Sequence, residues 1–155
     1  MSKLKEADFY YGAVISTLIN NGICPMLIES NNDRQIYEFT TNQKDFWLFL
    51  KYRSIASGTK RDDYSSWQFT FSASDISELQ DLVSQKKALS LGLICGTKKL
   101  IGSEYAVLHK KDVQRILDAN KTSLTISRRR GEKAFRISMG GGRDNAMLIR
   151  SNRVY

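Results

Sequence analysis

Hydrophobic positions in the first half of the chain change from a helical spacing to a strand spacing. From Ser2 to Asn20 apolar side chains recur every three or four residues, which predicts an amphipathic helix that ends at Asn21-Gly22. Strands are then predicted at 26–29, at 35–40, where apolar and polar residues alternate, and at 45–53. The last of these segments is apolar on both faces, which is typical of a strand in the middle of a sheet.

The second half of the chain predicts two further helices among more strands. A helix begins at Ser72, whose spacing to Asp75 resembles a capping box, and another spans 110–119. The continuous apolar run 88–95 predicts an interior strand. The polar stretch 55–66 is expected to be a mobile loop. The remaining strands are expected at 67–71, 105–108, 123–127, 134–139 and 146–149.

These elements predict an α+β fold in a single domain. A central mixed β-sheet carries the N-terminal helix and the two further helices, within a core formed by residues 1–120. Residues 121–155 are expected to form a C-terminal β-hairpin extension, because two apolar segments flank the charged turn 128–133. A chain of 155 residues is long enough to bury a core of its own.

Positive charge is concentrated at the C-terminal end of the chain. The whole sequence has a net charge of +8, and eight cationic against two acidic residues in 128–155 give that segment +6. A clustered positive field attracts polyanions, most often nucleic acid. The residues that we expect to contact phosphates are Arg128, Arg129, Arg130, Lys133, Arg136, Arg143 and Arg150.

Other binding chemistry is weakly represented. The chain has one histidine and two cysteines, too few soft ligands for a zinc site. Gly96-Thr97-Lys98-Lys99 follows a strand as a phosphate-binding loop does, but it lacks the ending of a P-loop. Phe135 and Tyr155 are candidates to stack on a base, although Phe135 also fits a core position. No cofactor is therefore expected from these residues.

The location of the protein is predicted from the same composition. The N-terminus is charged and amphipathic rather than an apolar leader, and no apolar run approaches the roughly 20 residues of a membrane span. Both cysteines lie in apolar runs, which fits buried thiols rather than a disulfide. We therefore expect a cytoplasmic protein with no membrane partner.

The order of elements in residues 4–118 resembles the PD-(D/E)XK superfamily, which has the restriction-endonuclease-like fold. That resemblance implies a metal-dependent nuclease in which carboxylates on neighbouring strands bind Mg²⁺ beside a lysine. Lys51 falls at the place of the motif lysine, Glu38 at that of the first acid, and Glu29 or Asp45 could add a carboxylate. Phe49 stands where the second motif acid would be, and it cannot ligate a metal. Either a carboxylate comes from elsewhere or the site is inactive.

Three functions follow as hypotheses. The first is a non-catalytic module that binds nucleic acid or nucleotide phosphates through the basic C-terminal residues. The second is a degenerate PD-(D/E)XK nuclease that uses Mg²⁺ with Glu29, Glu38, Asp45 and Lys51. The third is a small regulatory or inhibitor protein that docks on an acidic protein partner.

Overall fold

The computed structural model describes residues 3–31, 33–56, 64–140, 142, 145–152 and 155 of the chain. Within these residues the elements follow in the order α1 (Glu6–Asn20), β1 (Met26–Ser30), β2 (Gln35–Thr40), β3 (Asp45–Arg53), β4 (Tyr64–Thr70), α2 (Ala73–Ser84), β5 (Ala88–Cys95), β6 (Glu104–His109), α3 (Lys110–Asp118), β7 (Ser123–Arg129), β8 (Ala134–Ile137) and β9 (Met147–Arg150). The α+β class and the central mixed sheet predicted from the sequence are confirmed.

The first sheet has the strand order β1-β2-β3-β5-β6, with β3 in the centre. β1, β2 and β3 form an antiparallel meander, and β5 pairs antiparallel with β6. β3 and β5 are parallel, which is why the chain must cross over through α2 between them. β2 and β3 form a hairpin, and the predicted interior strand 88–95 is confirmed.

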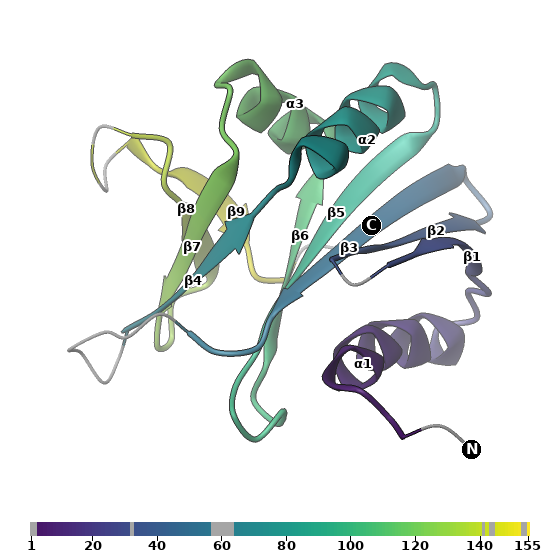
Figure 1. The fold of residues 1–155 in the computed structure, drawn as a ribbon, viewed down its shortest axis with the longest axis horizontal. Coiled ribbons are helices and arrows are strands. Elements are labelled where there is room, and N and C mark those ends of the chain that lie inside the picture. The colour runs from purple at the N-terminus through teal and green to yellow at the C-terminus, as the bar shows by residue number, and fades with distance from the viewer. Residues whose placement is uncertain (1–2, 32, 57–63, 141, 143–144, 153–154) are drawn as a thin grey trace.

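The two faces of the first sheet are covered by different layers (Figure 1). Along β3 the side chains alternate, so Phe46, Leu48 and Leu50 pack with α1 on one face. Phe49 points to the other face and joins a second core cluster with α2, α3 and the remaining strands. Because both faces are covered by apolar side chains, β3 is buried along most of its length.

A second sheet packs on the α2 side of the first and has the order β4-β7-β8-β9. The predicted C-terminal hairpin is present as β7 and β8, but it does not stand as a separate extension. After β3 the chain leaves the first sheet, and β4 pairs antiparallel with β7, so that both sheets contribute to one core cluster. The strands β7, β8 and β9 therefore complete a layer that begins with Tyr64.

Element boundaries differ from prediction chiefly around the polar stretch. β4 begins at Tyr64, three residues before the predicted start, because Ser65 and Ser66 continue the ladder with β7. Residues 57–63 of the predicted mobile loop lie outside the described residues. The capping box is confirmed, since Ser72 Oγ accepts from the Asp75 amide and Asp75 Oδ2 accepts from the Ser72 amide. None of the helices in the described part of the chain is long and apolar enough to cross a membrane.

Candidate nucleic-acid interface

The outer face of the second sheet is polar along β4 and β7, and β9 adds one exposed apolar side chain, Leu148, to it. Successive side chains on a strand point to opposite faces, so Trp67, Ile126 and Ile137 face the core while their neighbours face outward. The outward positions on β4 and β7 carry hydroxyl and amide groups, including Gln68 and Thr125. A sheet face with this composition offers hydrogen-bond donors and acceptors rather than an apolar surface.

Arginines extend this polar face toward the hairpin end of the sheet. Ser127 lies opposite Arg136, and Arg129 stands two residues farther along β7 on the same face. Ala134 lies opposite Arg150, so Arg129 and Arg150 flank Ala134 across three strands. At about 4.8 Å between neighbouring strands, their backbones are about 10 Å apart. The alternation thus brings cations that are 21 positions apart in the sequence to one side of the sheet.

Four of the predicted phosphate-binding residues are exposed, and together they form what we term the basic surface. Arg129 and Arg130 lie at the tip of the hairpin, and Lys133 bonds through its carbonyl to the Ser151 amide beside Arg150. In the described ranges no carboxylate forms an ion pair with any of the four. The basic surface consists of Arg129, Arg130, Lys133 and Arg150.

The other members of the predicted set are engaged or not described. Arg128 pairs with Glu104, donates from Nε to the Glu132 carbonyl at 2.7 Å, and stacks its guanidinium over Phe135. Arg136 forms an ion pair with Glu132 at 2.8 Å. These two arginines are half-buried and hold the hairpin together, so they are less available to a ligand. Arg143 lies outside the described residues.

A small cavity of about 250 Å³ opens between the hairpin tip and the loop that joins β5 to β6. Thr97 and Gly102 come from the loop, and Arg129, Arg130 and Gly131 come from the hairpin. Exposed Lys98 and Lys99 lie on the same loop. The Gly96–Lys99 segment, which the sequence marks as a weak phosphate-loop candidate, is therefore a neighbour of the basic surface. Its cations extend the positive field around the cavity.

The two aromatic candidates for base stacking occupy different environments. Phe135 is 1% exposed and belongs to the core, so it cannot stack on a base. Tyr155 is half-buried on the α1 face of the first sheet, where its ring meets Phe39 edge-on and its hydroxyl bonds to Tyr105. Neither ring lies on the outer face of the second sheet.

A buried network of charges surrounds Lys51, the lysine singled out by the family resemblance. Lys51 Nζ lies 2.8 Å from Asp75 Oδ2 and donates to the Asp33 carbonyl at 3.1 Å. Arg34 binds the other oxygen of Asp75 at 2.7 Å and reaches Glu29 at 2.7 Å. Lys51 is 6% exposed and Asp75 is 1% exposed. Lys51 is therefore buried in the protein, where Asp75 pairs with it.

Asp75 is held ionised by its partners. Burial favours the neutral acid, but the bonds from Lys51 and Arg34 and the Ser72 amide together lower the pKa of Asp75 below its ordinary value of 3.8. All of these donors converge at the N-terminal end of α2, where the helix dipole also favours a carboxylate. The network joins β3, the β1–β2 turn and α2.

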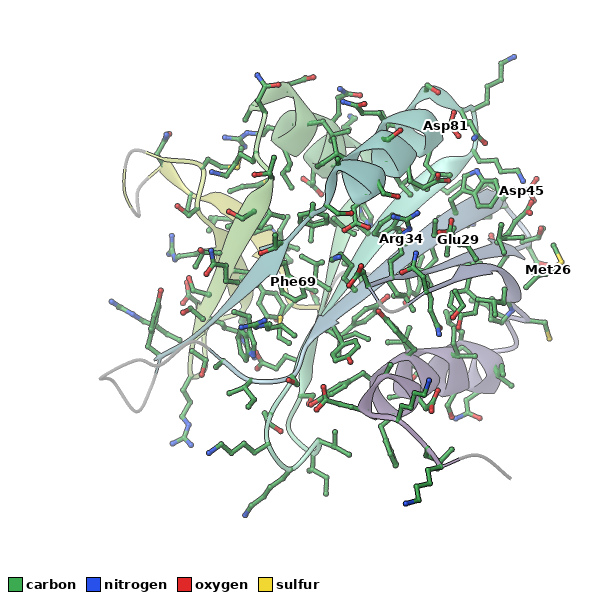
Figure 2. All side chains as sticks on the ribbon, in the orientation of Figure 1. Met26, Glu29, Arg34, Asp45, Phe69 and Asp81 are labelled. Atoms are coloured by element: carbon green, nitrogen blue, oxygen red, sulfur yellow. The ribbon has the colours of Figure 1, made fainter. Side chains whose placement is uncertain are left out.

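The structure brings only part of the predicted nuclease set together. Glu29 belongs to the Lys51 network through Arg34 and Asp75 (Figure 2). Glu38 lies opposite Trp47, about 13 Å along β3 from Lys51, and pairs with Lys87. Asp45 lies still farther along the same strand and accepts from Thr40 at 2.8 Å. Among the described residues no group of three or more histidine, cysteine, aspartate or glutamate side chains is placed to hold a metal ion.

Sequence reasoning missed two members of the network, Arg34 and Asp75. Arg34 follows a turn cluster and looks like an ordinary surface cation, yet it is 5% exposed. Asp75 gives a signal only as the acid of a capping box, and that signal says nothing about Lys51. The contact depends on β3 and the start of α2 meeting in space, which local sequence does not specify.

Comparison with protein-family models, with curated proteins and with solved structures finds no match for this chain. Its function is therefore argued from its own geometry.

Proposed function

We propose that this protein binds nucleic acid, without cleaving it, through the basic surface of its second sheet. The observation that carries the proposal is the gathering of Arg129, Arg130, Lys133 and Arg150 at one end of this sheet, exposed and without a paired carboxylate in the described ranges. Phosphate contacts made by arginine and lysine supply most of the affinity of such interfaces.

The neighbouring polar groups support contacts with a phosphate backbone. The cavity beside Gly131 is lined by three arginines and one carboxylate, Glu104, which pairs with Arg128. The exposed Lys98 and Lys99 belong to the β5–β6 loop that contributes Thr97 and Gly102 to this lining. Hydroxyl and amide side chains on the outer face of β4 and β7 add hydrogen-bonding groups next to the arginines. Such contacts position a nucleic acid but do not read its bases, so we expect little sequence preference.

The test is a fluorescence-polarisation titration with single-stranded DNA, duplex DNA and RNA over a series of salt concentrations. Bound phosphates release counterions, so affinity should fall steeply with salt. Replacing Arg129, Arg130 and Arg150 by alanine should weaken binding to duplex DNA and reduce the salt slope by roughly 2.7, at about 0.9 for each lost phosphate contact.

A matched control removes the same charge elsewhere. The control uses three exposed lysines that lie outside the second sheet. Lys3 and Lys5 precede α1, and Lys86 lies in the turn between α2 and β5. Their triple alanine variant loses the same three positive charges and should keep most of the salt slope. If both variants lost the same amount of affinity and salt slope, binding would depend on net charge and not on the basic surface. An affinity that does not change with salt would refute the proposal.

The same titration separates the competing functions. Cleavage of the probe on addition of Mg²⁺, abolished by Lys51→Ala, would support the nuclease instead. Stable capture of an acidic protein by a chain that binds none of the three nucleic-acid probes would support the regulatory hypothesis.

A further inference from the structure

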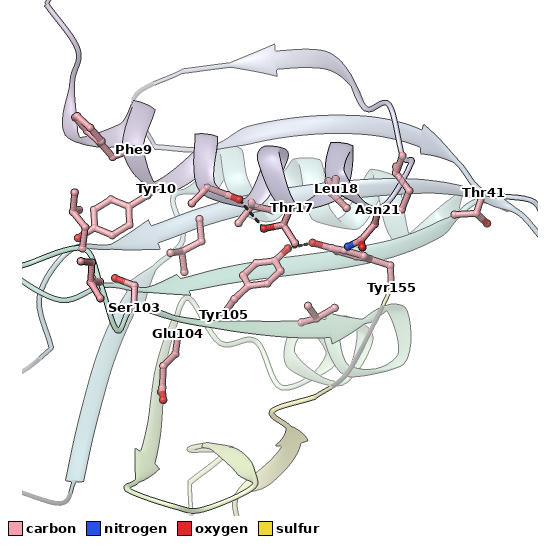
Figure 3. A pocket seen from close by; sticks show the side chains of 17 residues that line it. Phe9, Tyr10, Thr17, Leu18, Asn21, Thr41, Ser103, Glu104, Tyr105 and Tyr155 are labelled. Atoms are coloured by element: carbon pink, nitrogen blue, oxygen red, sulfur yellow. Dashed lines mark hydrogen bonds between the residues drawn. The ribbon is translucent and has the colours of Figure 1, made fainter.

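An apolar cavity of about 840 Å³ lies between α1 and the β5–β6 half of the first sheet (Figure 3). This volume falls within the range of pockets that bind small organic molecules. The cavity lies on the opposite face of the first sheet from α2, α3 and the second sheet. It is therefore separate from the basic surface. Its apolar walls include Val14, Leu18, Ile94, Val107, Leu100 and Ile101.

Exposed hydrophobic side chains rim this cavity. Phe9 is 48% exposed on α1, and Leu100 and Ile101 are 40% and 88% exposed on the β5–β6 loop. Isolated apolar residues on a surface need no explanation, but three around one hollow form a continuous apolar mouth. Contact with a bound apolar molecule would remove this surface from water.

The loop that carries two of these side chains has a strained backbone. Leu100 has φ of 67°, a left-handed conformation that residues with a side chain adopt rarely. Bonds from the Leu100 amide to the Thr97 carbonyl, and from the Ser103 amide to the Leu100 carbonyl, hold it there. Strain of this kind persists where the surrounding structure fixes it, often at binding sites. Here the left-handed conformation of Leu100 keeps Leu100 and Ile101 in the lining of the cavity.

Two tyrosines supply the buried polar feature of the cavity, whose lining also includes the polar side chains of Asn21 and Ser103. The hydroxyls of Tyr105 and Tyr155 are 2.5 Å apart and share one hydrogen bond. Each phenol carries a proton, so one proton is left over, and no acceptor for it is found among the described residues. Burial raises the pKa of Tyr155 to about 12 and that of Tyr105 well above its ordinary value, so both keep their protons at neutral pH. The pair therefore offers one donor.

The remaining wall offers no charge to a ligand. Thr17 donates to the Ala13 carbonyl and Thr41 to the Lys44 carbonyl, so both hydroxyl protons are used. Glu104 is the one charged side chain on the described wall, and Figure 3 shows it directed away from the cavity. Its carboxylate pairs with Arg128. An ion placed here would lose its water shell without a counter-charge.

We infer that this cavity is a binding site for a small, uncharged, mainly apolar molecule with one hydrogen-bond acceptor, such as a carbonyl, that receives the spare proton of the Tyr105–Tyr155 pair. The volume sets the size of the ligand, the walls set its apolar character, and the tyrosines set its single polar group. The site does not depend on the proposed binding of nucleic acid.

The first test uses Nile red, an uncharged apolar dye with a carbonyl oxygen. The protein should bind it saturably at one site, with increased and blue-shifted fluorescence. Ala13 lines the cavity, so Ala13→Trp fills it and should weaken binding at least tenfold. Ser16 is exposed on the same helix and does not line the cavity, so Ser16→Trp should change the affinity less than twofold. A thermal melt of each variant checks that it is folded.

The second test measures the polarity of the site by displacement of the dye. We expect 2-nonanone to compete and nonanoate to be at least tenfold weaker, because the carboxylate is charged. The ketone should bind roughly three- to tenfold more tightly than 1-nonene, and replacing both tyrosines, in Tyr105→Phe with Tyr155→Phe, should abolish this advantage because no hydroxyl proton is then left. No saturable dye binding, or equal binding by Ala13→Trp, would overturn the site. Equal affinity for nonanoate, or an unchanged ketone advantage in the double variant, would overturn the ligand class.

Discussion

Replacing Asp75 by asparagine should be strongly destabilising, although the two side chains have the same shape. Asp75 uses one oxygen for Arg34 and the other for Lys51 and the Ser72 amide. Asparagine has no charge, and its amide group presents donors to a cation where an acceptor is needed. Arg34 would keep its ion pair with Glu29, but Lys51 would lose the one carboxylate that pairs with it among the described residues.

The size of the effect follows from the burial of the three groups. Asp75, Arg34 and Lys51 are each less than a tenth exposed, so water cannot replace the lost carboxylate. Removing one partner of a buried ion pair costs about 3–5 kcal/mol. For a domain of this length that corresponds to a fall in melting temperature of roughly 6–20 °C.

The assay is urea unfolding of both proteins from pH 7 to pH 2. The pKa of Asp75 in the folded protein is lowered, so its stabilising contribution is complete above 3.8 and is lost as the pH falls through the folded value. The difference in the free energy of unfolding between wild type and Asp75→Asn should therefore be constant from pH 7 to about 5 and shrink below 3.8. Removing one cation as well, in Asp75→Asn with Lys51→Met, should restore part of the loss.

Asp81 provides the matched control for this prediction. It lies on the same helix and is exposed (Figure 2), and its carboxylate accepts only from Gln85, at 3.3 Å, among the described contacts. Asp81→Asn should change stability by less than about 0.5 kcal/mol. A loss of stability in Asp75→Asn no larger than in Asp81→Asn, or one that is unchanged at pH 2, would refute the account of a buried network.

Two further substitutions test the cap at the start of α2 and the packing of β5. Ser72→Ala should reduce the free energy of unfolding by about 1 kcal/mol, because the Asp75 amide loses its cap; a matched Ser84→Ala at the other end of α2 should cost less. Gly92→Ala should cost about 1–3 kcal/mol, because its new Cβ would lie 2.4 Å from the Tyr105 hydroxyl and 2.5 Å from a Leu50 methyl. Both are measured by chemical unfolding, and no change in either variant would contradict the packing described.

Much of the fold could be predicted because local periodicity and packing agree in it. The apolar run 88–95 has the same bounds as β5, and the two-faced pattern of 45–53 marks the central strand. The second sheet could not be predicted as a separate unit. A strand pattern shows that 67–71 is extended, but the choice between pairing with β3 and pairing with β7 depends on contacts that are distant in the sequence.

The buried network around Asp75 could not be predicted either, because it also depends on contacts between residues that are distant in the sequence. Charged residues are seldom fully buried, so composition alone assigns Arg34 and Lys51 to the surface. They are buried because Asp75 enters from α2, after a crossover that carries the chain through β4. The Phe71 amide bonds to the Thr122 carbonyl immediately before this helix, so the network and the second sheet are anchored at neighbouring positions. The start of α2 thus fixes both the Lys51 network and the sheet that carries the basic surface.

Arg128 and Arg129 show why counting charges could not tell which C-terminal cations are exposed and which are paired inside the protein. Arg128 shares the inward side of β7 with Ile126, so its guanidinium stacks over Phe135 and pairs with Glu104. Arg129 is one position later, points outward and is exposed. Strand alternation predicts that the two differ, but which of them faces inward depends on the pairing register with β4 and β8. A one-residue shift of that register would exchange their roles, burying Arg129 and exposing Arg128.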